Sequence, residues 1–292
     1  MTVDQLALLH TQASVCAERL ALPLRSQVWR GMAGEFQGAG TGSSIDFQDH
    51  RAYMPGDDPR HINWQAYART GNYSMKLYRE EVRPVIDIIL DASESMFFDP
   101  TKAARTTELF YFVTIAAIQA GASVNIHLLR GDAHTRLPMD AVISHHWMNT
   151  VLEMKPTRPS APLALDQIQL RGNAIRVLVS DLLFEGDPNH PLRHLSIQQG
   201  KPIIFAPFLR AEANPEWQGN YEFVDVEAGS QHSHRVEKST LRHFCKAYAA
   251  HFAEWHATAK RFNAPLARVC ANRPLLDALN EDAVSAGALV IK

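Results

Sequence analysis

The residues best placed to do chemistry lie in the stretch D-A-S-E-S-M, residues 91–96. Asp91, Ser93 and Ser95 supply a carboxylate and two hydroxyls at alternate positions, directly after the apolar run 85–90. That run predicts a buried strand, so the three oxygens can converge in the turn where the strand ends. Hard oxygen ligands of this kind suit Mg²⁺, Mn²⁺ or Ca²⁺ better than zinc or copper.

An alternative role for the same residues needs no metal. Asp91 can cap the turn that follows the strand, while the hydroxyls of Ser93 and Ser95 bond to nearby backbone groups. The residue types alone leave both interpretations open.

Strand and helix patterns alternate after this first strand. Apolar runs predict strands at 124–129, 175–180 and 202–208, with 134–137 as a hairpin partner, and helical periodicity marks 101–119, 141–154, 163–170 and 191–199. This alternation predicts an α/β fold with a doubly wound, mostly parallel sheet, of the Rossmann-like kind. Ligands of such sheets bind at the carboxyl ends of the strands, where Asp181 ends the strand 175–180 as Asp91 ends its own.

The flanks of this region differ from it. We expect an amphipathic helix at 3–22, a glycine-rich loop at 31–44, and a short strand at 75–78. The tail predicts an edge strand at 221–226, a helix at 240–262, a strand at 266–271 and a closing helix after Pro274. The chain is therefore expected to form an N-terminal helix with an irregular subdomain, residues 1–80, and an α/β domain, residues 81–292.

Composition limits the function. With 292 residues, 46% of them hydrophobic, the chain can bury a full core. A net charge of −2 offers no general attraction for nucleic acid. No apolar stretch is long enough to span a membrane, no signal peptide is evident, and three widely spaced cysteines imply no disulfide framework, so we expect a cytoplasmic protein.

Residues 46–69, called here the signature segment, alternate charges with aromatic side chains. One interpretation is a self-neutralising network in which its arginines pair with its aspartates. The other is a docking surface for a protein partner, built from Arg51, Arg60, Trp64 and Arg69, since arginine and aromatic residues are enriched at interfaces.

Two motifs resemble known families. The D-x-S-x-S of residues 91–95 resembles the metal-ion-dependent adhesion site (MIDAS) of von Willebrand factor type A domains. The signature segment resembles the signature of domain of unknown function 58, through Phe47, Arg51, Tyr53, Asp58, Arg60, Trp64 and Arg69, followed by Lys76 and Glu80-Glu81. V-S-D-L-L at 179–183 and D-V-E-A-G at 225–229 also fit that pattern. The family consists of bacterial proteins with a von Willebrand A-like domain, often encoded beside AAA+ ATPases of the MoxR class.

The resemblance implies a divalent-metal site, with Mg²⁺ as the first choice. Asp91, Ser93 and Ser95 take the first-loop positions, and Asp181 takes a later acidic position that reaches the metal through water. Thr157 and Ser160 are alternatives for one further ligand from an intermediate loop. Such a metal keeps an open position for a partner's carboxylate, which implies a non-enzymatic adaptor or co-chaperone that works with a MoxR-class AAA+ ATPase on a client protein.

Two other chemistries compete with this prediction. A metal-dependent phosphotransferase or hydrolase would use Asp91 as its nucleophile, although such sites usually read D-x-D and Ser93 stands at the second acid. The histidines at 145–146 and 232–234 would suit zinc, but no cysteine or acid stands at ligand spacing beside them.

Overall fold

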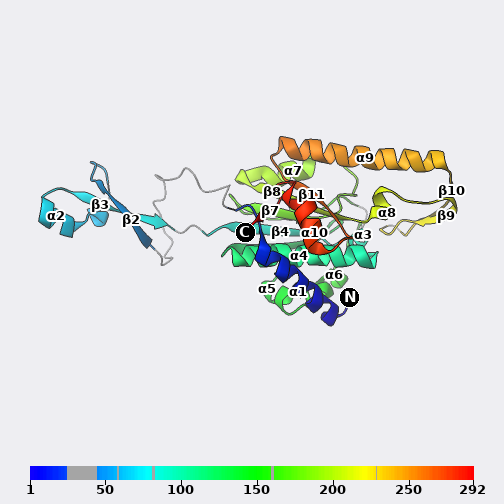
Figure 1. Cartoon of the computed structure of the whole chain (residues 1–292), viewed down its shortest axis with the longest axis horizontal. Helices are drawn as coiled ribbons and strands as arrows, with labels where there is room; N and C mark the ends of the chain where they lie inside the picture. Colours follow the sequence, from blue (N-terminus) through cyan, green and yellow to red (C-terminus); the bar gives the residue numbers. More distant parts are fainter. Residues whose placement is uncertain (25–44, 58, 81–82, 159–160, 228) are drawn as a thin grey trace. The chain divides into compact units, whose positions relative to one another are not determined.

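The computed structural model describes residues 1–24, 45–57, 59–80, 83–158, 161–227 and 229–292, and Figure 1 labels most of its helices and strands. The chain divides into two compact units. The larger comprises Met1–Val28 and Pro84–Lys292, and the smaller comprises Trp29–Arg83. The predicted glycine-rich loop at 31–44 lies outside the described residues.

A six-stranded sheet forms the centre of the larger unit, in the order β11-β8-β7-β4-β5-β6. Its strands are β4 (Val85–Asp91), β5 (Ser123–Arg130), β6 (Ala133–Leu137), β7 (Ile175–Val179), β8 (Lys201–Phe208) and β11 (Leu266–Cys270). Neighbouring strands are parallel except β5 and β6, which form the predicted hairpin. The prediction of an α/β fold with a mostly parallel central sheet is confirmed.

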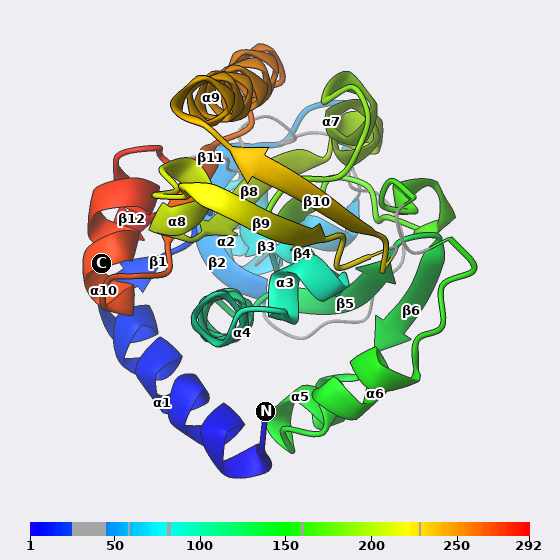
Figure 2. The ribbon, with the colours of Figure 1, turned by 90° about the vertical axis from the view of Figure 1, so that its right-hand side faces the viewer.

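Helices cover both faces of this sheet (Figure 2). On one face lie α1 (Val3–Arg19) and α4 (Pro100–Gln119), in an apolar cluster that includes Ile88 and Leu90 of β4. On the other lie α7 (Asn189–Ser196) and α9 (Lys238–Arg261), in a second cluster that includes Ile89. Successive side chains of a strand point to opposite faces, so the continuous apolar run of β4 supplies both clusters.

The N-terminal helix belongs to the larger unit. Thr2 and Gln5 form a capping box at its start, and its buried face, with Leu6 and Ala13, packs on α4. Beyond it, β1 (Leu20–Ala21) pairs antiparallel with β12 (Val290–Ile291) near the other end of the chain. The observed units therefore differ from the predicted division at residue 80, which grouped this helix with the signature segment.

Two predicted helices are wrong in form. The segment 141–154 contains two short helices, α5 (Met139–Ile143) and α6 (Trp147–Glu153), which are separated at His145 with its positive φ of 59°. The segment 163–170 contains only the 3₁₀ turn Leu165–Gln167. Its apolar side chains are nevertheless buried against the sheet, which explains why their spacing resembled that of a helix.

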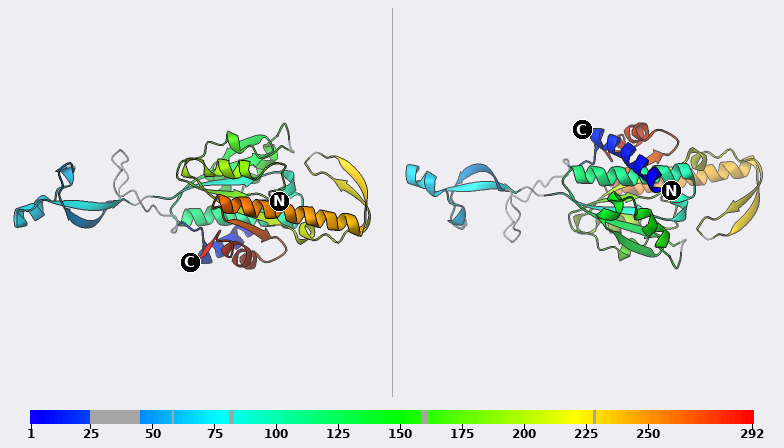
Figure 3. Two further views of the ribbon diagram at one scale, coloured as in Figure 1. Left: turned by 90° about the horizontal axis from the view of Figure 1, so that it is seen from above. Right: turned by 90° about the horizontal axis from the view of Figure 1, so that it is seen from below.

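The predicted edge strand at 221–226 does not join the central sheet. Instead β9 (Gly219–Val224) pairs antiparallel with β10 (Gln231–Val236) in a separate hairpin, at the same end of the unit as the start of α9 (Figure 3). The short helix α8 (Arg210–Ala213) precedes this hairpin. After β11 the chain forms α10 (Leu275–Ala278) and the π-helical turn Leu279–Val284.

The smaller unit is more regular than predicted. Its strands β2 (Ile45–Ala52) and β3 (Ser74–Glu80) form an antiparallel pair with an irregularity between positions 47 and 49. The 3₁₀ turn Pro59–His61 and helix α2 (Trp64–Thr70) connect them. Gly71 ends α2 in the left-handed region, at φ 70°, which a glycine adopts without steric cost.

The longest helices of the described part are α4, with 20 residues, and α9, with 24. Neither of these, nor any other described helix, combines the length and the apolar character needed to cross a membrane.

Candidate functional site

The carboxyl ends of the parallel strands form one rim of the sheet, called here the rim. Asp91 lies on this rim. Its side chain is buried at the end of β4, and both carboxylate oxygens accept hydrogen bonds. Oδ1 accepts from the backbone N–H of Ser93 at 3.0 Å, and Oδ2 accepts from the hydroxyl of Ser180 at 2.6 Å. Ser180 directly follows β7, so the two central strands hold the carboxylate between them.

The hydroxyls of Ser93 and Ser95 lie side by side. Their Oγ atoms are 3.1 Å apart, and Ser93, the N-cap residue of α3 (Glu94–Phe97), makes no side-chain capping bond. Asp91 accepts the backbone N–H of Ser93, as the metal-free interpretation predicted for a residue that caps the turn. The two hydroxyls, however, bond to each other, which leaves their remaining lone pairs for a ligand.

Asp181 lies on the same rim, but a lysine already pairs with it. Lys102 Nζ, from the first turn of α4, lies 2.7 Å from Asp181 Oδ2 and 2.7 Å from Glu212 Oε1. Burial opposes the charge of the ammonium, yet the two carboxylates outweigh it, so the pKa of Lys102 is raised. The second oxygen of Asp181 accepts the backbone N–H of Leu183.

No basic side chain of the described residues forms an ion pair with Asp91. Burial, and then the negative charge of Asp181, raise the pKa of Asp91 to about 7, although its bonds from Ser180 and Ser93 act in the opposite direction. A buried carboxylate with a raised pKa is one whose charged form lacks compensation. A cation beside it would supply that compensation.

Glu227 enters the site from the turn between β9 and β10. Its Oε1 accepts the backbone N–H of Ser95 at 2.9 Å. Its Oε2 is buried and accepts no hydrogen bond within the described part of the chain. Sequence reasoning included Glu227 only within a stretch that fits the family pattern and did not place it at the site.

Of the two predicted candidates for the loop ligand, the structure describes Thr157 but not Ser160. Thr157 is exposed on the loop after α6. The residue that follows it, Arg158, donates its backbone N–H to Asp132 Oδ1 at 3.0 Å. Asp132 lies in the turn after β5, so this loop lies on the same rim. No hydrogen bond of the described residues joins Thr157 to Asp91 or the two serines, and Ser160 lies outside the described residues.

The donor set consists of hard oxygens. Asp91 and Glu227 accept the backbone N–H groups of Ser93 and Ser95, and the Lys102 ammonium bridges Asp181 and Glu212. Among the described residues no three His, Cys, Asp or Glu side chains are placed to hold a metal. A cation here would therefore depend on the serine hydroxyls, as Mg²⁺ sites with few protein ligands do. The histidines proposed for zinc, 145–146 and 232–234, likewise form no such group.

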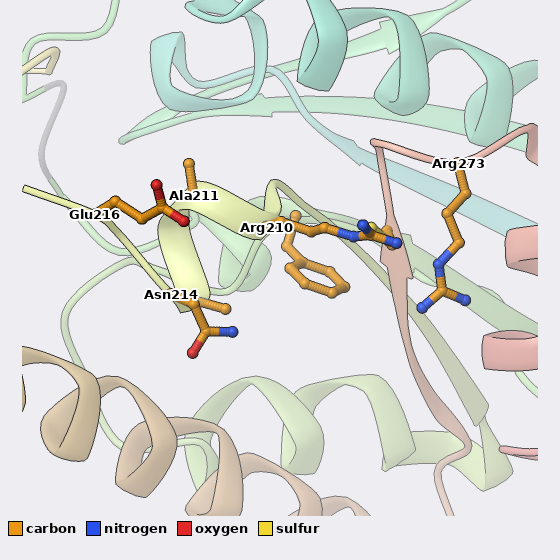
Figure 4. A pocket seen from close by; sticks show the side chains of 8 residues that line it. Arg210, Ala211, Asn214, Glu216 and Arg273 are labelled. Atoms are coloured by element: carbon orange, nitrogen blue, oxygen red, sulfur yellow. The ribbon is translucent and has the colours of Figure 1, made fainter.

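A cavity of about 610 Å³ opens farther along the rim, beyond the ends of β8 and β11. Figure 4 shows Arg210 and Arg273 on one side of it, with Asn214 and Glu216 toward the other. Arg273 forms an ion pair with Glu281, while the backbone N–H of Arg210 donates to Asn272. This cavity is adjacent to Glu212 along the chain, because α8 lines it.

In the smaller unit, the residues predicted to contact a partner divide into two groups. Arg51 forms a two-bonded ion pair with Asp57, at 2.8 and 2.6 Å, as the self-neutralising interpretation requires. Trp64 is 58% exposed and meets Tyr67 and Tyr73, which stack on each other at 4.4 Å. Arg60 and Arg69 are exposed. The aromatic side chains thus form an accessible cluster.

Comparison with known proteins gives a family but no described activity. A family model described as "Protein of unknown function DUF58" matches residues 49–254. The uncharacterized proteins Mb1516 of Mycobacterium bovis and Rv1480 of Mycobacterium tuberculosis are each 24% identical over 270 residues, covering 88% of this chain and 84% of theirs.

Two solved structures are more distantly similar. An aerotolerance-related membrane protein from Bacteroides fragilis shares 13% identity at a TM-score of 0.31, over 62% of this chain and 98% of that chain. The conserved hypothetical protein BatB from Bacteroides thetaiotaomicron shares 11% at a TM-score of 0.28, over 61% of this chain and 99% of that chain. These likenesses are too weak to support any inference about this chain.

Proposed function

We propose a function from two premises: the chain belongs to the DUF58 family, and its rim presents a cluster of hard oxygen donors. The function is that of a non-enzymatic protein-interaction module. Its rim holds a divalent cation, Mg²⁺ or else Mn²⁺ or Ca²⁺, in a site of the MIDAS type within a von Willebrand A-like domain. The family match confirms the resemblance seen in the signature segment, and the site and its use are our proposal.

The observation that supports it most directly is the arrangement of Asp91 with Ser93 and Ser95. The carboxylate is held rigidly by Ser180 and the Ser93 N–H, and two hydroxyls that do not cap the helix lie beside it, 3.1 Å apart. Asp91, Ser93 and Ser95 would hold the cation, and Asp181 would reach it through water. The cation, when bound, supplies an open coordination position for a carboxylate of another protein.

Thr157 is one of the two loop candidates, and its loop is connected to the rim. Arg130 connects its loop to the site, because the guanidinium donates to Glu94, between the two serines, and to the carbonyls of Val151 and Met154. The segment that leads to Thr157 is thereby attached to the rim. Ser160 stays an alternative, since nothing described bears on its position.

The proposed partner is a MoxR-class AAA+ ATPase, which acts on a client protein in the cytoplasm. The resemblance to DUF58 suggests this partner class, and the exposed cluster of Trp64, Tyr67 and Tyr73 offers a second contact surface of the kind that interfaces favour. A non-enzymatic role is supported by Ser93, which stands where hydrolase sites of the D-x-D kind carry their second acid.

A pull-down with the MoxR-class ATPase of the same genome tests the proposal. Wild-type chain should retain the ATPase in Mg²⁺ and lose it in EDTA, and Asp91→Asn should lose it in both. Asp140→Asn, which changes an exposed aspartate of α5, is the matched control. Equal recovery in every condition contradicts a cation-mediated contact. Turnover of phosphate esters that depends on Asp91 would instead favour the hydrolase alternative.

A further inference from the structure

Glu227 comes to the site from outside the central sheet, as Glu212 of α8 also does. It lies in the turn of the β9–β10 hairpin and is 132 residues from Ser95, whose backbone N–H it accepts. Its own N–H donates to Asp225 Oδ1 at 2.9 Å, and Gly229, at φ 68°, completes the turn. The turn therefore fixes the direction in which the Glu227 side chain points.

The hairpin extends across the rim. Figure 2 shows β9 and β10 in front of the carboxyl ends of the strands, with their turn toward α3, where Ser95 lies. Trp217, which precedes the hairpin, packs on it, since its ring lies 5.3 Å from that of Phe223 in β9 and 5.5 Å from that of Phe244 in α9. The contact at Ser95 is made by the turn of the hairpin.

Little apolar surface holds the hairpin in place. Among its described residues only Val236 is buried, and the side chains from Gln231 to Arg235 are exposed. A segment with few buried contacts opens at low cost in free energy. The position of its turn on the rim therefore depends on polar interactions, and the bond between Glu227 and Ser95 is one of them.

The two oxygens of Glu227 are in unequal environments. Oε1 accepts the Ser95 N–H, whereas Oε2 is buried without a hydrogen-bond donor, and no basic side chain of the described residues forms an ion pair with Glu227. Ser95 also supplies one of the two hydroxyls of the site. A carboxylate oxygen that is buried without a donor calls for a further partner, and beside the hydroxyl of Ser95 a cation can be that partner.

We propose that Glu227 is an internal ligand of the divalent cation, which it binds through Oε2. This inference rests on the proposed function, because it assigns to Glu227 the coordination position that a partner's carboxylate would otherwise take. The hairpin then closes the site in the free protein. An acidic side chain of the partner must displace Glu227 and release the hairpin turn from the rim.

Mg²⁺ and Mn²⁺ titrations of matched variants test the assignment. Glu227→Gln keeps the size and the acceptor for the Ser95 N–H but removes the charge, and Glu222→Gln makes the same change at an exposed position of β9. Glu227→Gln should bind either ion at least about tenfold more weakly than wild type, the low end of what a supporting residue contributes to metal affinity. Glu222→Gln should match wild type.

Hydrogen exchange supplies a readout that does not depend on affinity. Mg²⁺ should slow amide exchange across residues 225–231 in wild type and in Glu222→Gln, and leave it unchanged in Glu227→Gln. If wild type binds Mg²⁺ through Ser93 and Ser95 while Glu227→Gln binds it equally well and the hairpin exchanges at the same rate with and without Mg²⁺, the internal ligand is refuted and the proposed site stands. If wild type binds no Mg²⁺, the proposed site and the internal ligand both fail.

Displacement by a partner has its own outcome. At saturating Mg²⁺, Glu227→Gln should recover more MoxR-class ATPase than Glu222→Gln, because the internal competitor is gone. Equal or lower recovery overturns the competition.

Discussion

Replacing Lys102 by methionine is the sharpest test of the electrostatics at the rim. The Lys102 ammonium, with a side chain 2% exposed, lies 2.7 Å from both the Asp181 and the Glu212 carboxylates. Methionine fills similar space without the charge, so the substitution leaves Asp181, at 4% side-chain exposure, as an unpaired buried anion. Removing one partner of a buried pair costs about 3–5 kcal/mol, whereas Glu212, at 25% exposure, contributes less because water screens it.

Urea denaturation of Lys102→Met should therefore show a loss of about 3–5 kcal/mol in the free energy of unfolding. Lys246→Met, at an exposed position of α9, serves as the control and should change it by less than about 0.5 kcal/mol. Adding Asp181→Asn to Lys102→Met removes the unpaired charge and should restore part of the loss. A loss below about 1 kcal/mol for Lys102→Met would refute the assignment of a buried, charged pair.

Three further predictions concern the core. Arg171→Met should cost about 3–5 kcal/mol, because Asp87, fully buried, accepts from both the Arg171 Nε at 2.7 Å and its backbone N–H; thermal melts against Arg136→Met check this. Burial, and then His134, lower the pKa of His127 from 6.5 to about 4, so the unfolded chain binds the proton first and stability falls as the pH drops from 6.5 towards 4. The loss assigned to His127 is about 2 kcal/mol at pH 5, and His127→Gln should abolish that part of the pH dependence of unfolding. Gly200→Ala should lower the free energy of unfolding by about 1–3 kcal/mol in thermal melts, because the new Cβ would lie 2.4 Å from the Arg176 guanidinium. A melting temperature equal to that of wild type would contradict this prediction.

Much of the fold follows from local pattern. The apolar run before Asp91 had to become a buried strand, because only a strand in the middle of a covered sheet hides both of its faces. The acids at 91 and 181 fell on one rim for the same reason, since parallel strands bring their carboxyl ends together. These inferences need no knowledge of distant contacts.

The departures came from non-local contacts. The break at His145 has neither glycine nor proline to signal it, and it is accompanied by a hydrogen bond of 2.8 Å between His145 Nδ1 and the hydroxyl of Tyr111, 34 residues away. β10, with the sequence Q-H-S-H-R-V, shows no apolar alternation because almost all of its side chains are exposed. The sequence analysis did not identify Lys102 as a residue of the rim. Lys102 lies on the same helical face as the buried Leu109, seven residues later. A charged residue on an apolar face of a helix is the signal that would have found it.

The measurement that bears most directly on the central proposal is a calorimetric titration of Mg²⁺ into the full chain and into Ser93→Ala/Ser95→Ala. Wild type should bind one Mg²⁺, and the double variant should lose that binding while still unfolding cooperatively, because the hydrogen bonds described for the two hydroxyls join them to each other and to Asp91 rather than to the backbone. Ser144→Ala, which removes an exposed hydroxyl bonded within α5, should bind as wild type does. Undetectable binding to wild type, or equal binding to the double variant, would contradict a hydroxyl-dependent cation site at this rim.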